Sequence, residues 1–421
     1  MISLRNIKNL NFDSIPIDDS WNTGKNTELK MHRIHAYPAK FPAFITTKAL
    51  SYAKRERIKV KRIADVFCGC GTVAFEAKRN DVNFWGCDIN PVATLIARVK
   101  SHNYQQGRLK NYFDSIISTY SSSYKYRGSY NEANERIKHW YERKPFHELS
   151  RLKYSIDIAL PKRGKYRLFF FCAFSNILKS ASRWLTKSIK PQIDPEKEAG
   201  DVLTGFKDQC LFMMNANHES DAKEISSTEI VTRNFLDDTI AIPKVDMIIT
   251  SPPYVISYEY ADLHQLSTLW LDFADDYRDL RNGSLGSLYH VYKFEKELKR
   301  LNDTGSKIVF RLLGEDKNKA KYVAKYFLDM QKAIHKCYEM LSEKGLAVFV
   351  IGNTEYRSVR IDNAKHLAES MQSSGFKKIY ITKRKISKKI LTPYRDDRGC
   401  FTTDKNGRQV YAEEFILIGR K

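Results

Sequence analysis

Seven short segments rich in apolar, β-branched and aromatic residues recur along the 421-residue chain, and stretches with helical periodicity separate them. Short buried strands that alternate with helices are typical of a parallel sheet whose faces are covered by helices. The sequence therefore predicts a doubly wound α/β fold with seven strands. These strands are expected at Arg62–Phe67, Asn83–Asp88, Glu229–Arg233, Val245–Thr250, Leu346–Ile351, Lys377–Ile386 and Glu414–Ile418.

A long stretch with a helical pattern interrupts the series of strands. Between about residues 101 and 225 the sequence consists of basic, tyrosine-rich segments that include predicted helices at Asn131–Arg143 and Tyr166–Trp184. The second of these is too apolar to be exposed to solvent. We expect three parts: residues 1–100 and 226–421 as the two halves of one α/β core, and 101–225 as a helical insertion.

A glycine-rich turn follows the first predicted strand and precedes a helix expected at Thr72–Arg79. Glycine allows the chain to turn sharply and to approach a ligand closely, so this position suits a nucleotide-type pocket. Asp88 ends the second strand about 20 residues later, where a carboxylate can accept hydrogen bonds from ribose hydroxyls. Alternatively, Asp88 caps the helix that Pro91 opens. The turn reads Asp65-Val66-Phe67-Cys68-Gly69-Cys70-Gly71-Thr72, with Ala74 where a dinucleotide motif has its third glycine.

A second motif, Ser251-Pro252-Pro253-Tyr254, directly follows the apolar strand Val245–Thr250. Sites in α/β sheets lie at the carboxyl ends of the strands, so this tetrapeptide is expected beside the glycine turn. The Ser251 hydroxyl and the Pro252 carbonyl oxygen can both accept hydrogen bonds, and proline fixes the direction of the chain. The alternative is a polyproline turn with a purely structural role.

Together these motifs resemble the amino-group DNA methyltransferases, whose cofactor motif reads D-x-F-x-G-x-G and is followed by a strand that ends in an acidic residue. Cys70 replaces the small residue, most often serine, that the family has between its glycines. The resemblance implies a Rossmann-like methyltransferase sheet that binds S-adenosylmethionine. It assigns catalysis to Ser251, Pro252, Pro253 and Tyr254, and cofactor binding to Tyr37, Pro38, Ala39, Asp65, Phe67, Cys68, Gly69, Gly71, Thr72, Asp88, Ile89 and Ser251.

The upstream segment from His35 to Pro42 resembles the family segment that folds over the methionine end of the cofactor. A tight turn made by its two prolines, ahead of a helix that begins near Ala43, would have the same backbone. This segment is therefore expected at the cofactor pocket or as a structural turn.

The resemblance also implies a reaction: direct methyl transfer to an exocyclic amine of a flipped base, without a metal or a covalent enzyme intermediate. Ser251 and Pro252 would accept the amine protons, and Tyr254 would stack on the base. Serine in this motif favours N4 of cytosine, and adenine N6 is the alternative, because the motif order here differs from the commonest serine-bearing arrangement. An RNA amino-methyltransferase and a binding module without turnover are further alternatives.

The charge of the chain favours a nucleic-acid partner. Lys and Arg number 71 against 49 Asp and Glu, a formal charge of +22, which suits double-stranded DNA. The alternative is a lysine-rich surface that is merely solvated. We assign the insertion to recognition of a DNA sequence, because basic residues and tyrosines are interleaved across Tyr104–Arg167. The basic run Lys377–Lys389 fits either DNA contact or a charged, exposed sheet edge. A restriction endonuclease companion is expected.

Cysteine usage and the N-terminal residues indicate the compartment. Seven cysteines lack a C-x-x-C pair, so neither a disulfide framework nor a zinc cluster is indicated. Met1–Asp19 lacks the continuous apolar stretch of a signal peptide or a membrane span. We therefore expect a cytoplasmic protein that is not bound to a membrane, and the sequence does not indicate its oligomeric state.

Overall fold

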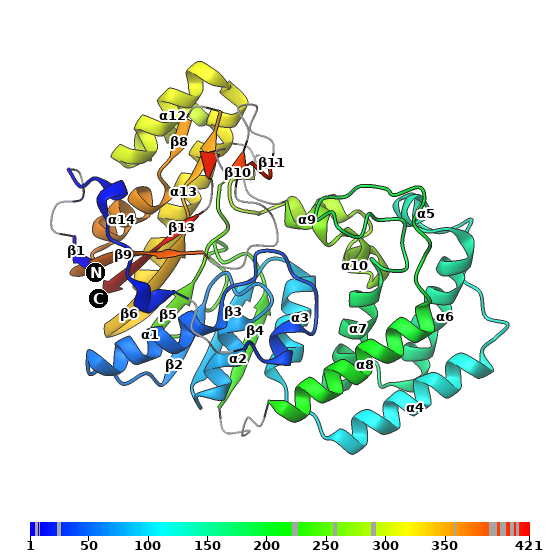
Figure 1. Cartoon of the computed structure of the whole chain (residues 1–421). Helices are drawn as coiled ribbons and strands as arrows, with labels where there is room; N and C mark the ends of the chain where they lie inside the picture. Colours follow the sequence, from blue (N-terminus) through cyan, green and yellow to red (C-terminus); the bar gives the residue numbers. More distant parts are fainter. Residues whose placement is uncertain are drawn as a thin grey trace.

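The computed structural model describes the whole chain except residues 5–6, 8, 23–26, 221–225, 256–258, 288–291, 358, 387–393, 396–400, 405–407 and 410–411. The expected boundary between the insertion and the second half of the core therefore lies outside the described residues, as does Cys400. Figure 1 shows an α/β unit built around one large sheet, with a group of helices on one side of it.

The large sheet has eight strands in the order β1-β9-β13-β6-β5-β2-β3-β4. The five strands from β6 to β4 are parallel, whereas β13 runs antiparallel to both of its neighbours and β1 antiparallel to β9. The strands are β1 Ile2–Ser3, β2 Arg62–Asp65, β3 Asn83–Asp88, β4 Thr228–Thr232, β5 Val245–Thr250, β6 Leu341–Ile351, β9 Lys378–Lys385 and β13 Glu413–Arg420. All seven predicted strands are present, and the α/β fold class is confirmed.

Two differences from the predicted sheet have local causes. β1 is only two residues long, too short for any periodicity to reveal it. β6 begins at Leu341, five residues before the predicted start. Leu341 pairs with Val245 of β5, and the polar residues Ser342 to Lys344 lie in the register shift that precedes the next pair, Leu346 with Met247. Small sheets are formed by β7 Thr354–Tyr356 with β8 Val359–Ile361, and by β10 Tyr394–Arg395 with β11 Phe401–Thr402 and β12 Arg408–Gln409.

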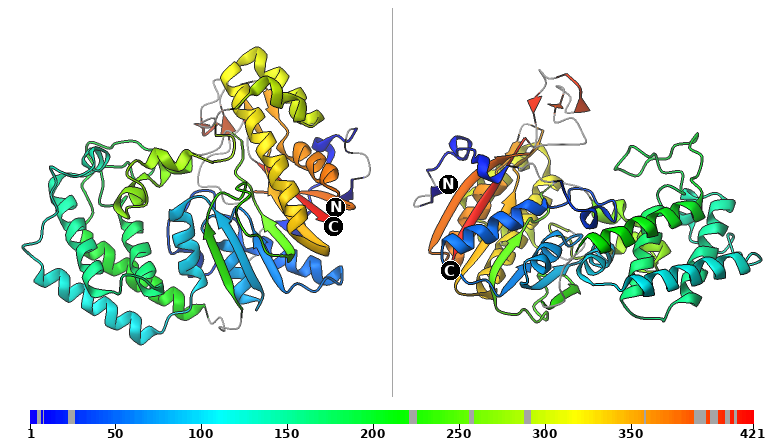
Figure 2. Two further views of the ribbon diagram at one scale, coloured as in Figure 1. Left: turned by 180° about the vertical axis from the view of Figure 1, so that it is seen from behind. Right: turned by 60° about the horizontal axis from the view of Figure 1, so that its bottom comes forward.

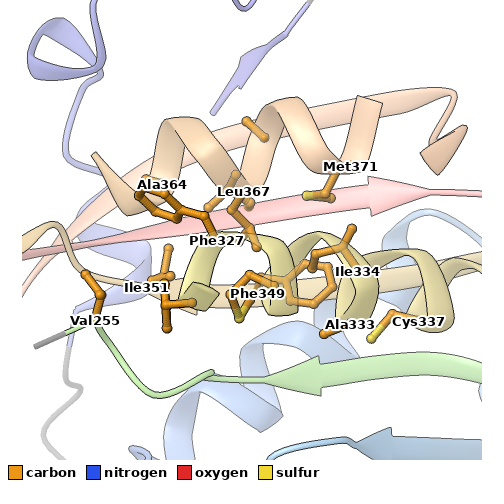
Figure 3. Packing of buried hydrophobic residues seen from close by; sticks show 14 of the residues in the cluster. Val255, Phe327, Ala333, Ile334, Cys337, Phe349, Ile351, Ala364, Leu367 and Met371 are labelled. Carbon is orange, nitrogen blue, oxygen red and sulfur yellow. The ribbon is translucent and has the colours of Figure 1, made fainter. Parts of the chain in front are cut away.

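Helices cover both faces of the sheet, because alternate residues of each strand point to opposite faces. On β6, Ala347, Phe349 and Ile351 face one layer of helices, whereas Val348 and Val350 face the other. The first layer contains α12 Asp303–Glu315, α13 Lys317–Met340 and α14 Asn363–Ser374, and Figure 3 shows side chains of α13 and α14 packed against β6. The second layer contains α1 Ala43–Arg55, α2 Thr72–Arg79 and α3 Pro91–Ser101.

Five helices form a lobe beside the sheet, which the two views of Figure 2 show as a group of its own. The residues of these helices share a hydrophobic cluster that includes Phe169, Phe170 and Phe174. The helical lobe comprises α4 Gln106–Ser122, α5 Glu135–Trp140, α6 Arg143–Ala159, α7 Lys165–Ile177 and α8 Val202–Glu219. It is joined to the core through contacts of α7 with α3.

Two helices of the lobe are shorter than predicted. The side chain of Asn134 accepts a hydrogen bond from the amide of Arg136, so α5 begins at Glu135 and not at Asn131. α7 ends at Ile177, and Trp184 instead stacks on Trp140 with ring centroids 4.9 Å apart. The remaining α-helices are short and follow the tetrapeptide motif along the chain. They are α9 Tyr260–Leu263, α10 Gln265–Trp270 and α11 Phe294–Glu297.

Candidate active site

The two predicted motifs meet where the strand order reverses. β2 lies between β3 and β5 and is parallel to both, so the carboxyl ends of β2 and β5 are neighbours. Asp65 ends β2 and Thr250 ends β5, and the Thr250 hydroxyl donates a hydrogen bond of 2.6 Å to Asp65 Oδ1. Both residues are buried. This reversal point is where open α/β sheets bind their ligands.

The glycine turn has the backbone that the motif requires. Gly69 and Gly71 have φ values of +47° and +74°, a region that favours glycine. A Cβ on Gly71 would lie 2.6 Å from the Cα atom of Ala97 in α3, so a larger residue cannot fit. The turn is thereby held against α3, and its backbone passes directly from β2 into α2.

Asp88 holds the turn through its carboxylate. One carboxylate oxygen accepts a hydrogen bond from the amide of Gly69 (2.8 Å) and the other from the amide of Asn90 (2.9 Å). The cap of α3 is Asn90, whose side chain accepts from the amide of Val92, so Asp88 is not the helix cap. Burial raises the pKa of Asp88, and the two amide donors oppose that shift.

The segment from His35 lies over the glycine turn. A Cβ on Gly69 would be 3.4 Å from the Tyr37 hydroxyl oxygen, and the Tyr37 ring stacks on that of Tyr260 with centroids 5.9 Å apart. Pro38 is half-buried, and Ala39 is exposed with a positive φ of 52°. The Tyr37 side chain therefore lies over the glycine turn.

The other predicted cofactor residues surround the same turn. The amide of Phe67 donates to Asp65 Oδ1 (3.2 Å), and burial raises the pKa of Cys68 well above its usual value. Ile89 is half-buried beside Asp88. The Thr72 hydroxyl is buried without a hydrogen-bond partner. A buried hydroxyl at the start of the helix that follows the turn is a polar group with which a cofactor could form a hydrogen bond.

Asp65 is strongly perturbed. Burial raises its pKa from 3.8 to about 7, and the hydrogen bonds from Thr250 and from the amide of Phe67 oppose the shift. A buried carboxyl group with such a pKa, placed where the ends of two strands meet, is typical of a functional site.

Three of the four residues of the tetrapeptide are anchored, each by a different element. The Ser251 hydroxyl donates to the Val350 carbonyl oxygen of β6 (2.9 Å), and the Pro253 carbonyl oxygen accepts from the Tyr326 hydroxyl of α13 (2.8 Å). The Tyr254 hydroxyl donates to Glu414 Oε1 of β13 (2.8 Å). Within the described residues no protein donor engages the Pro252 carbonyl oxygen. The tetrapeptide is therefore held rigidly, and the Pro252 carbonyl oxygen can still accept a hydrogen bond.

Sequence reasoning missed several residues that contact the predicted ones. Glu414, Arg384 and Tyr326 support the tetrapeptide, and the side chain of Asn90 contacts His264 Nδ1 at 2.7 Å. Burial lowers the pKa of His264 to about 3, so this ring is neutral. No motif signalled these residues, because they come from distant strands and helices that only the fold brings together.

The described part of the chain holds no cluster of three or more His, Cys, Asp or Glu side chains that could bind a metal, and its six cysteines are free. None of its helices combines the length and the apolar character that a membrane crossing needs. Lys383 and Arg384 are buried within the basic run of β9, so these two residues are not part of a charged, exposed edge.

The sheet, with the glycine turn and the tetrapeptide at its reversal point, has the arrangement expected of an S-adenosylmethionine-dependent methyltransferase. Residues 50–279, more than half of the chain, match the D12 class N6 adenine-specific DNA methyltransferase family, and the chain belongs to that family. It is thus a DNA methyltransferase that uses S-adenosylmethionine, as the sequence predicted. The family description names adenine N6, which supports the alternative target base and not the predicted cytosine N4.

One relative agrees with this assignment. The chain is 23% identical over 395 residues to the Type II methyltransferase M.MvaI of Kocuria varians, a match that covers 87% of this chain and 86% of the relative. Among solved structures it is similar to TehB from Haemophilus influenzae (9% identity, 89% of this chain and 62% of that one) and to a methyltransferase from Methanosarcina mazei (7% identity, 92% and 98%). Both TM-scores are 0.29.

Proposed function

We propose that this protein transfers the methyl group of S-adenosylmethionine to the exocyclic amine of a base in double-stranded DNA. The observation that carries the proposal is the hydrogen bond between Thr250 and Asp65, which joins the cofactor turn to the catalytic tetrapeptide. The two motifs therefore lie at the ends of adjacent strands, where the cofactor at one motif would be next to the base at the other.

The chain's own residues fit the cofactor. Asp88 would accept hydrogen bonds from the ribose hydroxyls, and the free Thr72 hydroxyl offers a further polar contact. Tyr37, with Pro38 and Ala39, would cover the methionine end, while Phe67, Cys68 and Ile89 line the turn beside Gly69 and Gly71. When bound, S-adenosylmethionine supplies a methyl group activated by its positive sulfur.

Ser251 and Pro252 would activate the amine. An exocyclic amine shares its lone pair with the ring and is a poor nucleophile until acceptors draw on its protons. The Ser251 proton is directed to the Val350 carbonyl oxygen, so the lone pairs of Ser251 Oγ remain free to accept. Proline lacks an N–H group, and the Pro252 carbonyl oxygen can serve as the second acceptor. Pro253 makes the platform rigid, and Tyr254 offers a ring for the flipped base.

The target base has two candidates, each with its own support. The family description favours adenine N6. Ser251 at the first position of the tetrapeptide favours cytosine N4, because serine is associated mainly with that base in the related enzymes.

The base can be identified by mass spectrometry of nucleosides from unmethylated plasmid DNA after incubation with the protein and S-adenosylmethionine. N6-methyladenine or N4-methylcytosine is expected, and either one identifies the base. The appearance of neither, with cofactor binding demonstrated, would contradict the proposal and would favour a binding module without turnover. Methylation of transfer RNA in place of plasmid DNA would favour the RNA alternative.

We further propose that the helical lobe, residues 101–225, contacts DNA and reads its sequence. Tyr124 is 63% exposed beside the exposed Lys125, and the ring of the exposed Tyr126 stacks on that of Tyr154 with centroids 4.2 Å apart. Exposed aromatic rings with basic neighbours suit stacking on bases and contact with phosphates. The Type II designation of the Kocuria relative supports a restriction endonuclease companion, which genes next to this one would reveal.

A further inference from the structure

Tyr254 is held by residues that no motif includes. Its hydroxyl donates a hydrogen bond of 2.8 Å to Glu414 Oε1, and Glu414 belongs to β13 at the far end of the sequence. Its ring rests on Gly352, the residue that follows β6. The tyrosine of the tetrapeptide is thus fixed both at its hydroxyl and along its ring.

Glu414 is itself oriented by a buried arginine. Both Arg384 Nε (2.8 Å) and Arg384 Nη2 (2.5 Å) contact Glu414 Oε2, which leaves Oε1 for the Tyr254 hydroxyl. The Arg384 side chain is only 3% exposed and that of Glu414 15%. A buried ion pair is costly to desolvate and stabilises a fold little, so a positioning role accounts for this pair better than a contribution to stability does.

Gly352 has a different reason to be glycine. Its φ lies outside the left-handed region, so its backbone accepts any residue. A Cβ there would lie 2.8 Å from Tyr254 Cε2, and its three closest atoms would all belong to the Tyr254 ring. A side chain at position 352 would therefore displace that ring.

We propose that Glu414, Arg384 and Gly352 are positioning residues that fix the ring of Tyr254 in the plane on which the target base stacks. The inference rests on the proposed role of Tyr254 as the platform for the flipped base. Because the hydroxyl proton is committed to Glu414, Tyr254 contributes its ring face to the base and not a hydrogen-bond donor. Stacking tolerates any base, so recognition of the base falls to other groups.

The chain contains a matched control for Glu414. Glu413 is its neighbour on β13 and is also paired with a basic residue of β9, since Lys383 Nζ lies 3.0 Å from Glu413 Oε2. Successive residues of a strand point to opposite faces, so Glu413 does not reach Tyr254. Loss of either glutamate removes one ion pair, and only loss of Glu414 frees the tyrosine.

The test compares Glu414→Ala, Glu414→Gln, Glu413→Ala and Tyr254→Phe in the full chain. The probes are single-turnover methylation of unmethylated plasmid DNA and calorimetric binding of S-adenosylhomocysteine. We expect Glu414→Ala and Tyr254→Phe to slow transfer by about ten-fold, the effect of losing one hydrogen bond to a charged group. Glu414→Gln, whose amide oxygen still accepts, should stay within about three-fold of the wild type, and Glu413→Ala should match it. Affinity for S-adenosylhomocysteine should be unchanged throughout.

Double variants provide the second measurement. In a Tyr254→Phe background, Glu414→Ala should slow transfer no further. Gly352→Ala, which displaces the ring, should slow transfer in the wild-type background but not in a Tyr254→Ala background. The positioning role would be overturned if the losses of transfer rate in the double variants were additive. It would also be overturned by equal rates for Glu414→Ala and Glu413→Ala, or by a shifted pH profile of the transfer rate in Glu414→Gln. Absence of methylation by the wild-type protein would instead contradict the proposed function itself.

Discussion

Replacement of Gly71 by alanine tests the geometry of the cofactor turn. The residue has φ of +74°, a conformation that costs an alanine about 1–2 kcal/mol. Its new Cβ would lie 2.6 Å from the Cα and Cβ atoms of Ala97, and such overpacking of a closely packed site costs about 1–3 kcal/mol more. We therefore expect Gly71→Ala to lower the free energy of unfolding by about 2–5 kcal/mol.

The assay is urea denaturation followed by circular dichroism, with S-adenosylhomocysteine absent. Gly107→Ala is the matched control, because Gly107 lies in the first turn of α4 and a Cβ there meets nothing within 4 Å. That change should leave stability unchanged or raise it by up to about 1 kcal/mol. Equal denaturation midpoints for Gly71→Ala and the wild type would refute the close approach of the turn to α3.

Three further predictions concern the cofactor pocket and the lobe. Asp88→Ala should weaken calorimetric binding of S-adenosylmethionine by about 1–3 kcal/mol, and unchanged affinity in the folded variant would remove Asp88 from the site. Because burial raises the pKa of Asp65 from 3.8 to about 7, the folded protein retains a proton there that the unfolded chain loses. The stability of the ligand-free protein should therefore decline as pH rises from about 4 to about 7, and Asp65→Asn should lack that part of the decline in urea titrations across this range. Replacing the exposed Lys125, Arg127 and Lys144 of the lobe by glutamine should weaken DNA binding and flatten its salt dependence. The same change at the exposed Lys54, Arg57 and Lys59 of the core should do neither. Equal effects of the two sets would contradict DNA contact by the lobe.

The fold was predictable from the sequence wherever burial leaves a periodic pattern. The helix Thr72–Arg79 and the strand Val245–Thr250 match their predicted bounds residue for residue. The glycine turn and the tetrapeptide were expected together because each follows a parallel strand, and the contact between Asp65 and Thr250 confirms that they meet.

The support of the site was not predictable in this way. Arg384 lies in the run Lys378–Lys385, which resembles a charged edge, yet β1 and β13 pair with that strand on its two sides and the arginine is buried. Its partner Glu414 is 30 residues away in sequence, and Tyr254 is 160 residues from Glu414. Such contacts depend on strand order, which a local pattern of residues does not encode.

Single-turnover methylation by Ser251→Ala tests most directly whether the tetrapeptide activates the amine. Ser155→Ala is the control, because the Ser155 hydroxyl also donates to a backbone carbonyl, that of Arg151, but lies in the helical lobe. We predict that Ser251→Ala slows transfer to unmethylated plasmid DNA by roughly ten- to a thousand-fold, with S-adenosylmethionine and DNA affinities unchanged, because the acceptor acts mainly in the transition state. Full methylation by Ser251→Ala, at the rate of Ser155→Ala and the wild type, would contradict the catalytic role of the tetrapeptide and leave it a structural turn.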